Sequence, residues 1–369
     1  MQQHLDIHLD IEVSGHSFCL SCGAEPGGPA RSVFLGSGPV PAELALPSGL
    51  TARPVRPDDL AAVAELLAAA ERVDDTGEHE SVEDLREWWV NDLVDLERDS
   101  LVVRTPDGAA VAVATVIAPP TFRDAMTVYL DGRVHPRRRG RGIGRALLAW
   151  QLERGAQLHA ERHPEAPARL TMTVWSSMPD AAALARRAGL VAQREFHHMA
   201  RRLTDLPEVP VPPGVELKPF SWAQDEEVRR AHNVAFADHY GSSERDQASW
   251  QLMFTGQRSF RPDLSVLAVS AGAVVGYVLA YVHDADTEAT GERRTYFGQI
   301  GVLPHARGRG ISRAAIAAAL RAAAERDCQV AALQVDRENG SGAGRLYAGL
   351  GFTTERTDVS WVRLLPARR

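Results

Sequence analysis

Cysteine is scarce in this chain, which has only Cys19, Cys22 and Cys328 among its 369 residues. Three cysteines are too few for a disulfide framework, so the sequence favours a reducing compartment and predicts a cytoplasmic protein. Cys19 and Cys22, with His16 nearby, supply only part of a four-ligand zinc site, and no second Cys-x-x-Cys pair follows. We therefore expect two reduced thiols in place of a metal centre.

Long apolar runs and an excess of basic residues are missing as well. No apolar stretch of roughly 18 residues, the length that a membrane helix needs, occurs. Residues 1–12 carry acids and histidines instead of the basic start of a signal peptide. The 41 Lys and Arg residues against 48 Asp and Glu residues give a net charge of −7, which argues against a dedicated nucleic-acid binder. With 44% hydrophobic and 24% charged residues, the composition is typical of a folded globular protein.

An internal repeat organises the sequence that is present. Residues 134–143 and 302–311 share a Val, a Pro and the run Arg-Gly-Arg-Gly-Ile, 168 residues apart. Two similar units predict two copies of one domain, which we call copy one (residues 50–203) and copy two (residues 215–369). Four prolines in residues 204–214 predict an extended linker between the copies. Residues 1–48, rich in Gly and Pro, are expected to form a poorly ordered extension.

Each copy shows the same order of expected elements. A helical pattern over residues 60–71 opens copy one, and strand pairs follow at 101–103 and 111–117, or at 266–269 and 274–281, around turns that contain Gly. Alternating strands end at Val134 and Val302, the Arg/Gly loop follows, and apolar helices begin at Ile143 and Ile311. Later strands and a short helix complete each copy. The predicted fold class is α/β, with a mixed sheet that is built twice.

The Arg/Gly loop predicts an anion site. A helix that begins directly after a Gly-rich loop presents unsatisfied backbone N–H groups and a positive dipole end. Gly140, Gly142 and Gly144 allow a phosphate to approach the backbone closely. The Walker pattern is absent, and the glycines lack the spacing of the dinucleotide-binding fingerprint. The loop therefore predicts a phosphate or pyrophosphate site outside both nucleotide folds.

The two loops resemble a known motif. Arg139-x-x-Gly142-x-Gly144 and Arg307-x-x-Gly310-x-Ser312 are similar to the acetyl-coenzyme A pyrophosphate loop of the GNAT superfamily of N-acetyltransferases, Gln/Arg-x-x-Gly-x-Gly/Ala. Asn339 and the run Leu346–Phe352 resemble the closing motif of that family. The resemblance covers residues 50–203 and 215–366, and two units in one chain resemble the tandem group that includes mycothiol synthase. It implies two GNAT domains, each a mixed, mostly antiparallel twisted sheet flanked by helices.

The resemblance also implies which residues bind acetyl-coenzyme A as co-substrate. Except for Asn339 of the closing motif, they lie on the end of a strand, on the loop and on the first turn of the next helix. In copy two they are Ile300, Val302, Arg307, Gly308, Arg309, Gly310, Ile311, Ser312 and Asn339, and in copy one Val134, Arg139, Gly140, Arg141, Gly142, Ile143 and Gly144. A solvated or nucleic-acid-binding arginine patch is the alternative, which the repetition of the pattern and the net charge disfavour.

The implied chemistry is direct attack of a neutral amine on the thioester, which requires a base, an oxyanion donor and an acid. The implied donor is a backbone N–H between Ile300 and Val302. The implied acid is Tyr347, because a phenol of pKa near 10 is protonated at neutral pH and can protonate a thiolate of pKa roughly 8.5; the alternative is a packed aromatic ring. Gln299 stands where several relatives carry a glutamate base. A water chain or His239 is therefore the expected base.

Copy one lacks the acid, because Ala185 aligns with Tyr347. We expect catalysis in copy two, while copy one binds coenzyme A without turnover or forms a wall of the acceptor pocket. The predicted function is acetyl-coenzyme A dependent acetylation of a primary amine on a small molecule, without nucleic-acid or membrane partners. A non-catalytic acyl-coenzyme A sensor and an interaction protein are the alternatives. Mycothiol precursor, aminoglycoside, polyamine, amino acid and peptide N-terminus all remain as acceptors.

Overall fold

The computed structural model describes residues 44–89, 95–119, 121–237, 244–338 and 342–368. The strands of copy one are β1 (Thr51–Arg53), β2 (Ser100–Arg104), β3 (Ala110–Ile117), β4 (Met126–Val134), β5 (Ala168–Trp175) and β6 (Val191–Arg202). Its helices are α1 (Leu60–Asp74), α2 (Val82–Trp89), α3 (Leu96–Asp99), α4 (Ile143–Arg162) and α5 (Pro179–Arg187).

Copy two repeats this order with two differences in the described residues: two helices instead of three precede its second strand, and a further helix, α8, lies between its third and fourth strands. Its strands are β7 (Glu216–Pro219), β8 (Val266–Ser270), β9 (Ala273–Tyr281), β10 (Arg294–Val302), β11 (Val330–Asp336) and β12 (Thr353–Leu365). Its helices are α6 (Asp225–Ala235), α7 (Gln247–Trp250), α8 (Asp284–Thr290), α9 (Ile311–Ala324) and α10 (Ala343–Ala348).

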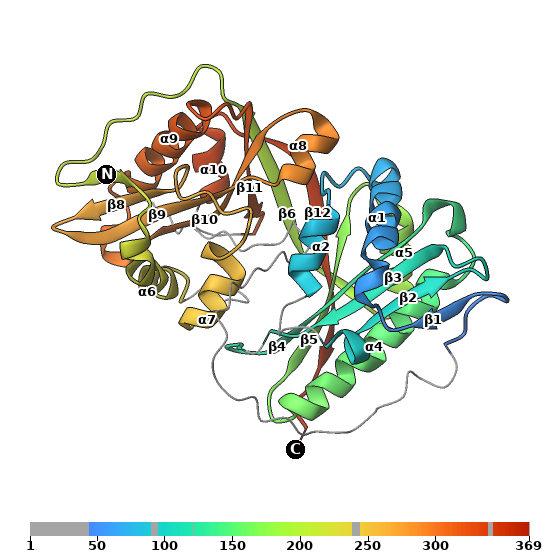
Figure 1. Ribbon diagram of the computed structural model, residues 1–369. Coiled ribbons are helices and arrows are strands. Elements are labelled where there is room, and N and C mark those ends of the chain that lie inside the picture. Colours follow the sequence, from blue (N-terminus) through green and yellow to red (C-terminus); the bar gives the residue numbers. More distant parts are fainter. Residues whose placement is uncertain (1–43, 90–94, 120, 238–243, 339–341, 369) are drawn as a thin grey trace, which may run out of the picture.

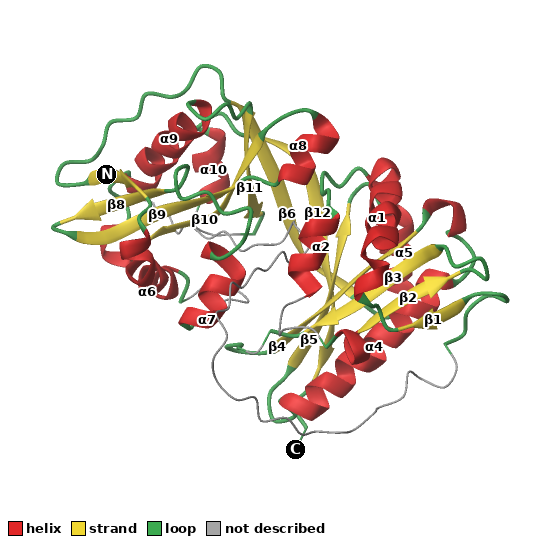
Figure 2. Ribbon diagram, viewed as in Figure 1, coloured by secondary structure: helices red, strands yellow, loops and turns green. Residues whose placement is uncertain are grey.

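All of these strands join one sheet, in the order β1-β2-β3-β4-β5-β12-β6-β11-β10-β9-β8-β7. The two copies form two lobes, and the long strands β6 and β12 lie between them (Figure 1). Helices cover both faces of the sheet in each lobe (Figure 2). The predicted fold class, a mixed α/β sheet repeated twice, is confirmed.

The last strand of each copy pairs in the other copy. Strand β12 of copy two pairs antiparallel with β5 of copy one, and β6 of copy one pairs antiparallel with β11 of copy two. β6 and β12 also pair with each other. The sheet of neither copy is therefore complete without a strand from the other.

Among the described strands, two pairs are parallel; both are short, and the strands separate beyond them. β4 pairs with β5 over Met126–Tyr129, and β10 pairs with β11 over Arg294–Tyr296. Both β4 and β10 continue beyond these pairs, to Val134 and Val302. Their later residues therefore keep one edge turned toward a gap in the sheet, directly before the Arg/Gly loop.

Each copy packs a hydrophobic cluster on either face of its sheet. Helix α1 buries Leu60, Val63, Leu66 and Ala70, whose spacing of three to four residues is that of an amphipathic helix. Leu44 and Leu46, within the segment expected to be an extension, pack on the larger cluster of copy one. Leu206 and Val209, in the linker, pack on the corresponding cluster of copy two. Each copy is thus preceded by a segment that covers part of its core.

The expected alternation along β10 is wrong at one point. In an unbroken strand Tyr296, Ile300 and Val302 would share a face, but the register shifts between Phe297 and Gln299. Tyr296 consequently packs in the cluster under α6, whereas Ile300 and Val302 pack in the cluster under α9. An extra residue in one strand reverses the facing of every residue before it, and here Gly298 sits at that bulge. No helix in the described ranges has the length and apolar character to cross a membrane.

Candidate functional site

The Arg/Gly loops of both copies adopt the same backbone conformation. Gly140 and Gly142 have φ of 72° and 88°, and Gly308 and Gly310 have φ of 73° and 80°. Gly142 and Gly310 directly precede α4 and α9. No atom lies within 4 Å of the position that a Cβ would take at Gly140, Gly308 or Gly310. Each loop therefore presents open backbone at a helix N-terminus, where an anion is favoured.

The first arginine of each loop turns back onto its own lobe. Arg139 Nε donates to Val134 O at 3.0 Å and Arg307 Nε to Val302 O at 3.1 Å. The Arg139 guanidinium also makes two hydrogen bonds to Asp74, of 2.6 and 2.7 Å. Arg307 Nη2 instead donates to Ala235 O at 2.9 Å. These arginines fix the loop to the preceding strand and helix, so the backbone is left to meet the anion.

The inner edge of β10 carries the predicted oxyanion donors. Leu303 N–H donates to Val275 O on β9. Along an antiparallel pair the hydrogen-bonding direction alternates, so Gly301 and Gln299 also turn toward β9. Ile300 and Val302 therefore direct their backbone groups toward the gap between β10 and β11. The Val302 carbonyl accepts a hydrogen bond from Arg307 Nε, and the N–H groups of Ile300 and Val302 face the gap.

A cavity of about 1470 Å³ passes through the corresponding gap of copy one. All seven residues predicted for the copy-one site line it: Val134, Arg139, Gly140, Arg141, Gly142, Ile143 and Gly144. Arg138, Arg145 and Arg187 add positive charge to its wall, and Arg363 reaches it from the exchanged strand β12. The cavity therefore combines an anion-binding end with an apolar passage along Leu130, Leu170 and Met172.

The tyrosine of copy two is fully buried behind the gap. Tyr347, on α10, has 0% exposure and packs in the cluster under α9 with Leu333 and Val335. Its ring meets Phe352 edge to face, with centroids 6.2 Å apart. At the matching position of copy one Ala185 is also buried, with no polar side chain.

The two copies also differ beside the open strand edge. His135 N–H donates to Val111 O as Leu303 N–H does to Val275 O, so Arg133 in β4 matches Gly301 in β10. Arg133 forms ion pairs with Asp131 at 3.1 Å and Glu78 at 3.6 Å. Burial would lower the pKa of Arg133, but the carboxylates of Asp131, Glu78, Asp74 and Glu80 raise it. Copy one thus has a charged arginine at the position where copy two has Gly301, which lacks a side chain.

In copy two a buried tyrosine fills the space beside Gly301. A Cβ on Gly301 would lie 2.6 Å from the Tyr277 ring, so the glycine is required for the close approach. The Tyr277 hydroxyl lies 2.9 Å from His232 Nδ1 on α6, inside an aromatic cluster. Gln299 is 1% exposed on the same strand. An aromatic ring therefore fills the space beside Gly301 in copy two, where copy one has an ion-paired arginine.

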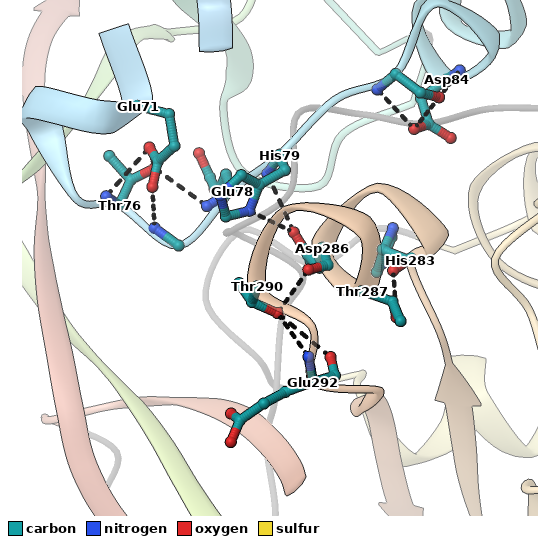
Figure 3. Close-up of polar contacts among 12 residues, drawn as sticks. Glu71, Thr76, Glu78, His79, Asp84, His283, Asp286, Thr287, Thr290 and Glu292 are labelled. Carbon is teal, nitrogen blue, oxygen red and sulfur yellow. Dashed lines mark hydrogen bonds and ion pairs between the residues drawn. The ribbon is translucent and has the colours of Figure 1, made fainter. Parts of the chain in front are cut away.

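The loop of copy one that carries Glu78 also contacts copy two (Figure 3). The backbone N–H of His79 donates to Asp286 Oδ1 at 3.1 Å, and its Nδ1 lies 3.0 Å from the same oxygen. Asp286 belongs to α8, the helix that copy one lacks. Residues of both copies thus meet over the centre of the sheet.

Two predicted site residues, His239 and Asn339, lie outside the described residues, as do Cys19 and Cys22. Within the described ranges, no group of three or more His, Cys, Asp or Glu side chains could hold a metal ion. Ser312 is half-buried in the first turn of α9, and Arg309 Nη2 donates to Pro213 O at 3.3 Å.

Comparison with known proteins decides the family, because residues 60–174 and 226–352 both match the acetyltransferase (GNAT) family. The chain belongs to the GNAT family of acetyltransferases. This tandem GNAT protein is 34% identical over 345 residues to a protein named mycothiol acetyltransferase from Frankia alni, covering 88% of this chain and 95% of that one. It is 32% identical to another of that name from Parafrankia sp., covering 84% and 96%.

Solved structures agree on the fold of this GNAT enzyme. A GCN5-related N-acetyltransferase from Sphaerobacter thermophilus has a TM-score of 0.68 at 27% identity, covering 87% of this chain and 97% of that one. A tandem GNAT protein from the clavulanic acid biosynthesis pathway has a TM-score of 0.61 at 21% identity, covering 85% and 98%. The chain is an N-acetyltransferase with two GNAT domains.

Sequence reasoning missed the residues that make the two GNAT sites unlike each other. Asp74, Glu78 and Arg133 come from two separate segments, and no motif marks them. One signal was available in the sequence. Aligning the two repeats through Val134 and Val302 places Arg133 at the position of Gly301.

Proposed function

We propose that this GNAT protein transfers the acetyl group of acetyl-coenzyme A to a primary amine of a small molecule, and that copy two carries out the chemistry. The observation that supports this most directly is the position of Tyr347. It is buried on α10 behind a strand edge whose Ile300 and Val302 N–H groups face the gap. Copy one has no acidic side chain at the matching Ala185.

In this proposal the pyrophosphate of acetyl-coenzyme A lies on the backbone of residues 307–312 and at the N-terminus of α9. The open Cβ positions at Gly308 and Gly310 fit a phosphate there. The thioester lies in the gap between β10 and β11, where the carbonyl oxygen accepts a hydrogen bond from the inner edge of β10. Asn339 of the closing motif is proposed to contact the same co-substrate.

The reaction then proceeds by direct attack. A neutral amine adds to the thioester carbon, the tetrahedral oxyanion is stabilised by the β10 N–H groups, and the C–S bond breaks. Tyr347 gives its phenolic proton to the departing thiolate and recovers one that the nitrogen loses. The products are the N-acetyl compound, coenzyme A and one proton released to solvent. A base must first remove a proton from the ammonium, and His239 remains a candidate for it.

For copy one we propose coenzyme A binding without turnover. The cavity of about 1470 Å³, with backbone at one end and arginines around it, fits the elongated co-substrate. The charged Arg133 and the absence of an acid at Ala185 argue against chemistry there. The alternative function, an acyl-coenzyme A sensor, would require that copy two behave in the same way.

The test is a coenzyme A release assay over a panel of amines. The deacetylated amine precursor of mycothiol is the first compound to try, because the relatives that cover nearly the whole chain carry the name mycothiol acetyltransferase. Aminoglycosides, polyamines, amino acids and peptide N-termini complete the panel. Acetyl-coenzyme A binding without release of coenzyme A for any amine would favour the sensor.

A further inference from the structure

The exchanged strands create a polar cluster at the centre of the sheet. His198 on β6 comes from copy one, while Gln334 on β11 and Asp358 on β12 come from copy two. His198 Nε2 lies 2.6 Å from Asp358 Oδ2, and Gln334 Nε2 lies 3.1 Å from the same oxygen. Trp175 of β5 packs on the imidazole, with ring centroids 4.3 Å apart. The three polar groups thus form one connected set that neither copy has alone.

Two groups contact the Nε2 atom of His198: Asp358 Oδ2 at 2.6 Å and the amide Nε2 of Gln334 at 3.1 Å. A carboxylate accepts hydrogen bonds but does not donate them, so the shorter contact assigns the proton of the neutral ring to Nε2, and the Gln334 amide then donates to Asp358. Nδ1 is then the basic nitrogen. Among the described residues, no hydrogen bond of His198 Nδ1 occurs, and the side chain is 17% exposed. His198 therefore has an oriented ring with its basic nitrogen available.

The neighbouring residue provides a contrast. His197 points to the opposite face, where it lies 3.2 Å from Glu195 through Nε2 and 3.3 Å from Thr354 Oγ1 through Nδ1. Both of its nitrogens are engaged, and its side chain is 29% exposed. Adjacent histidines on one strand thus have the same chemistry but different environments.

The cluster borders the gap in which the thioester of the proposed reaction would lie. β10 and β11 pair only as far as Tyr296 and Ala332. Gln334 is two residues further on, on the same face as Ala332, and it is directly opposite His198. Neighbouring strands lie about 4.8 Å apart, so His198 is one strand away from the gap. Tyr347 packs on the other face, with Leu333 and Val335.

One carboxylate oxygen of the cluster also lacks a partner. Asp358 is 1% exposed, and no described residue makes a hydrogen bond to its Oδ1. A buried acceptor left without a donor is unfavourable, because it has lost its hydrogen bonds to water. An ammonium group or a water that accompanies it would satisfy this oxygen, which makes the unpartnered atom a second indication of a ligand beside His198.

We propose that His198, oriented by Asp358, is the general base of the acetyl transfer in copy two. The inference rests on the proposed function. His198 Nδ1 takes one proton from the acceptor ammonium, directly or through one water, and the amine lone pair that remains attacks the thioester carbon. His198 returns that proton to solvent after the product leaves. Base and acid then act from opposite faces of the sheet, and copy one supplies the base for the chemistry of copy two.

Charged groups on every neighbouring element act on this base. Burial first, and then the charges of Asp358 and Glu78, raise the pKa of Tyr296 on β10, which places negative charge on this face of the sheet. The other charged and titratable groups of the face are Arg194 of β6 paired with Asp336 of β11, Arg356 of β12 bound to Asp75, and His79 with Asp286 on the covering loop and α8.

The test is the pH profile of kcat/KM for His198→Gln, with His197→Gln as the matched control. At pH 7, His198→Gln should lower kcat/KM by about 10²-fold, because the acceptor must lose its proton unaided. The loss should shrink by about tenfold for each pH unit, as the free amine becomes available without a base. Affinity for acetyl-coenzyme A and the melting temperature should match those of His197→Gln, which keeps the wild-type profile.

Two further variants keep the inference open to failure. Asp358→Asn removes the carboxylate that orients the imidazole, so kcat/KM at pH 7 should fall by about tenfold or more, and the loss should again shrink at higher pH. His239→Gln tests the alternative base. A loss in His198→Gln that is equal at every pH, or a limb that disappears in His239→Gln instead, would overturn the assignment. A wild-type enzyme inactive on every amine would contradict the proposed function, whereas an active enzyme with a normal His198→Gln profile contradicts only this inference.

Discussion

The two copies have the same Arg/Gly loop conformation, but the strands that precede the loops, β4 and β10, differ. Both loops place two glycines at positive φ before a helix, and both turn their first arginine back onto the preceding strand. Yet β4 pairs with β3 in unbroken register, whereas β10 has a bulge between Phe297 and Gln299. An ion-paired Arg133 stands beside the edge of β4, where β10 has Gly301. Our proposal therefore treats coenzyme A binding and catalysis as separable properties of the two copies.

Blocking each loop should separate these properties most strongly. Gly310→Val puts a branched side chain where the proposed pyrophosphate of copy two lies, and turnover should fall to the detection limit. Gly142→Val should do the same to the anion site of copy one and spare most turnover. Steady-state rates and calorimetric titration with acetyl-coenzyme A measure the two effects.

Backbone strain needs a control of its own, since a β-branched residue at positive φ costs about 1–3 kcal/mol wherever it stands. Gly291 ends α8 with φ of 71° and has no atom within 4 Å of its Cβ position. Gly291→Val should therefore show the strain without loss of turnover. Loss of activity in a folded Gly142→Val protein, with activity kept in Gly310→Val, would assign catalysis to copy one.

Tyr347→Phe should have the next largest effect. Removing the phenolic proton leaves the thiolate without an acid, so kcat should fall by about 10²-fold while acetyl-coenzyme A affinity is nearly kept. Phe352→Leu, which changes the ring that packs on Tyr347, is the control for altered packing. A Tyr347→Phe enzyme with wild-type kcat would mean that the residue only packs.

The sequence could predict those parts of this protein that depend on a few neighbouring residues. The repeat, the Arg/Gly loops and the helices that follow them depend on short motifs, and the structure has them where the motifs stand. The exchange of β6 and β12 could not be predicted. The residue pattern along each strand is compatible with pairing in either lobe, so it does not specify the partner strand. The bulge at Gly298 and the ion pairs of Arg133 likewise depend on contacts between distant segments.

Acid should destabilise copy one before copy two. Burial alone would raise the pKa of Asp59, but hydrogen bonds from Arg53, the Arg56 backbone and Arg104 lower it to about 2. A carboxyl whose pKa is lower in the folded state stabilises the protein above its unfolded pKa near 4, and this stabilisation is lost as the pH falls from about 4 to 2. The contribution is about 2 kcal/mol.

Copy two offers the comparison. Lys218 on β7 corresponds to Arg53 on β1, and Gln224, which ends the turn before α6, corresponds to Asp59, which ends the turn before α1. Asp59→Asn should lower the free energy of unfolding at pH 7 and flatten its dependence on pH between about 2 and 4. Urea denaturation, followed by probes in each lobe, measures this. Equal acid sensitivity in the wild type and in Asp59→Asn would show that the network contributes nothing.

The smallest effect concerns the segments that precede each copy. Leu44 and Leu46 pack on the core of copy one as Leu206 and Val209 of the linker pack on that of copy two. Deleting residues 1–43 removes none of these contacts, and the free energy of unfolding should change by less than about 0.5 kcal/mol. Deleting residues 1–48 removes two partly buried leucines and should cost about 1–3 kcal/mol. Replacing Leu206 and Val209 by Ala should lower the free energy of unfolding of copy two by a similar amount, since each segment covers part of the core of the copy that follows it. If instead the shorter deletion lowers stability and releases stoichiometric zinc, Cys19 and Cys22 hold a metal and the first 43 residues belong to the fold.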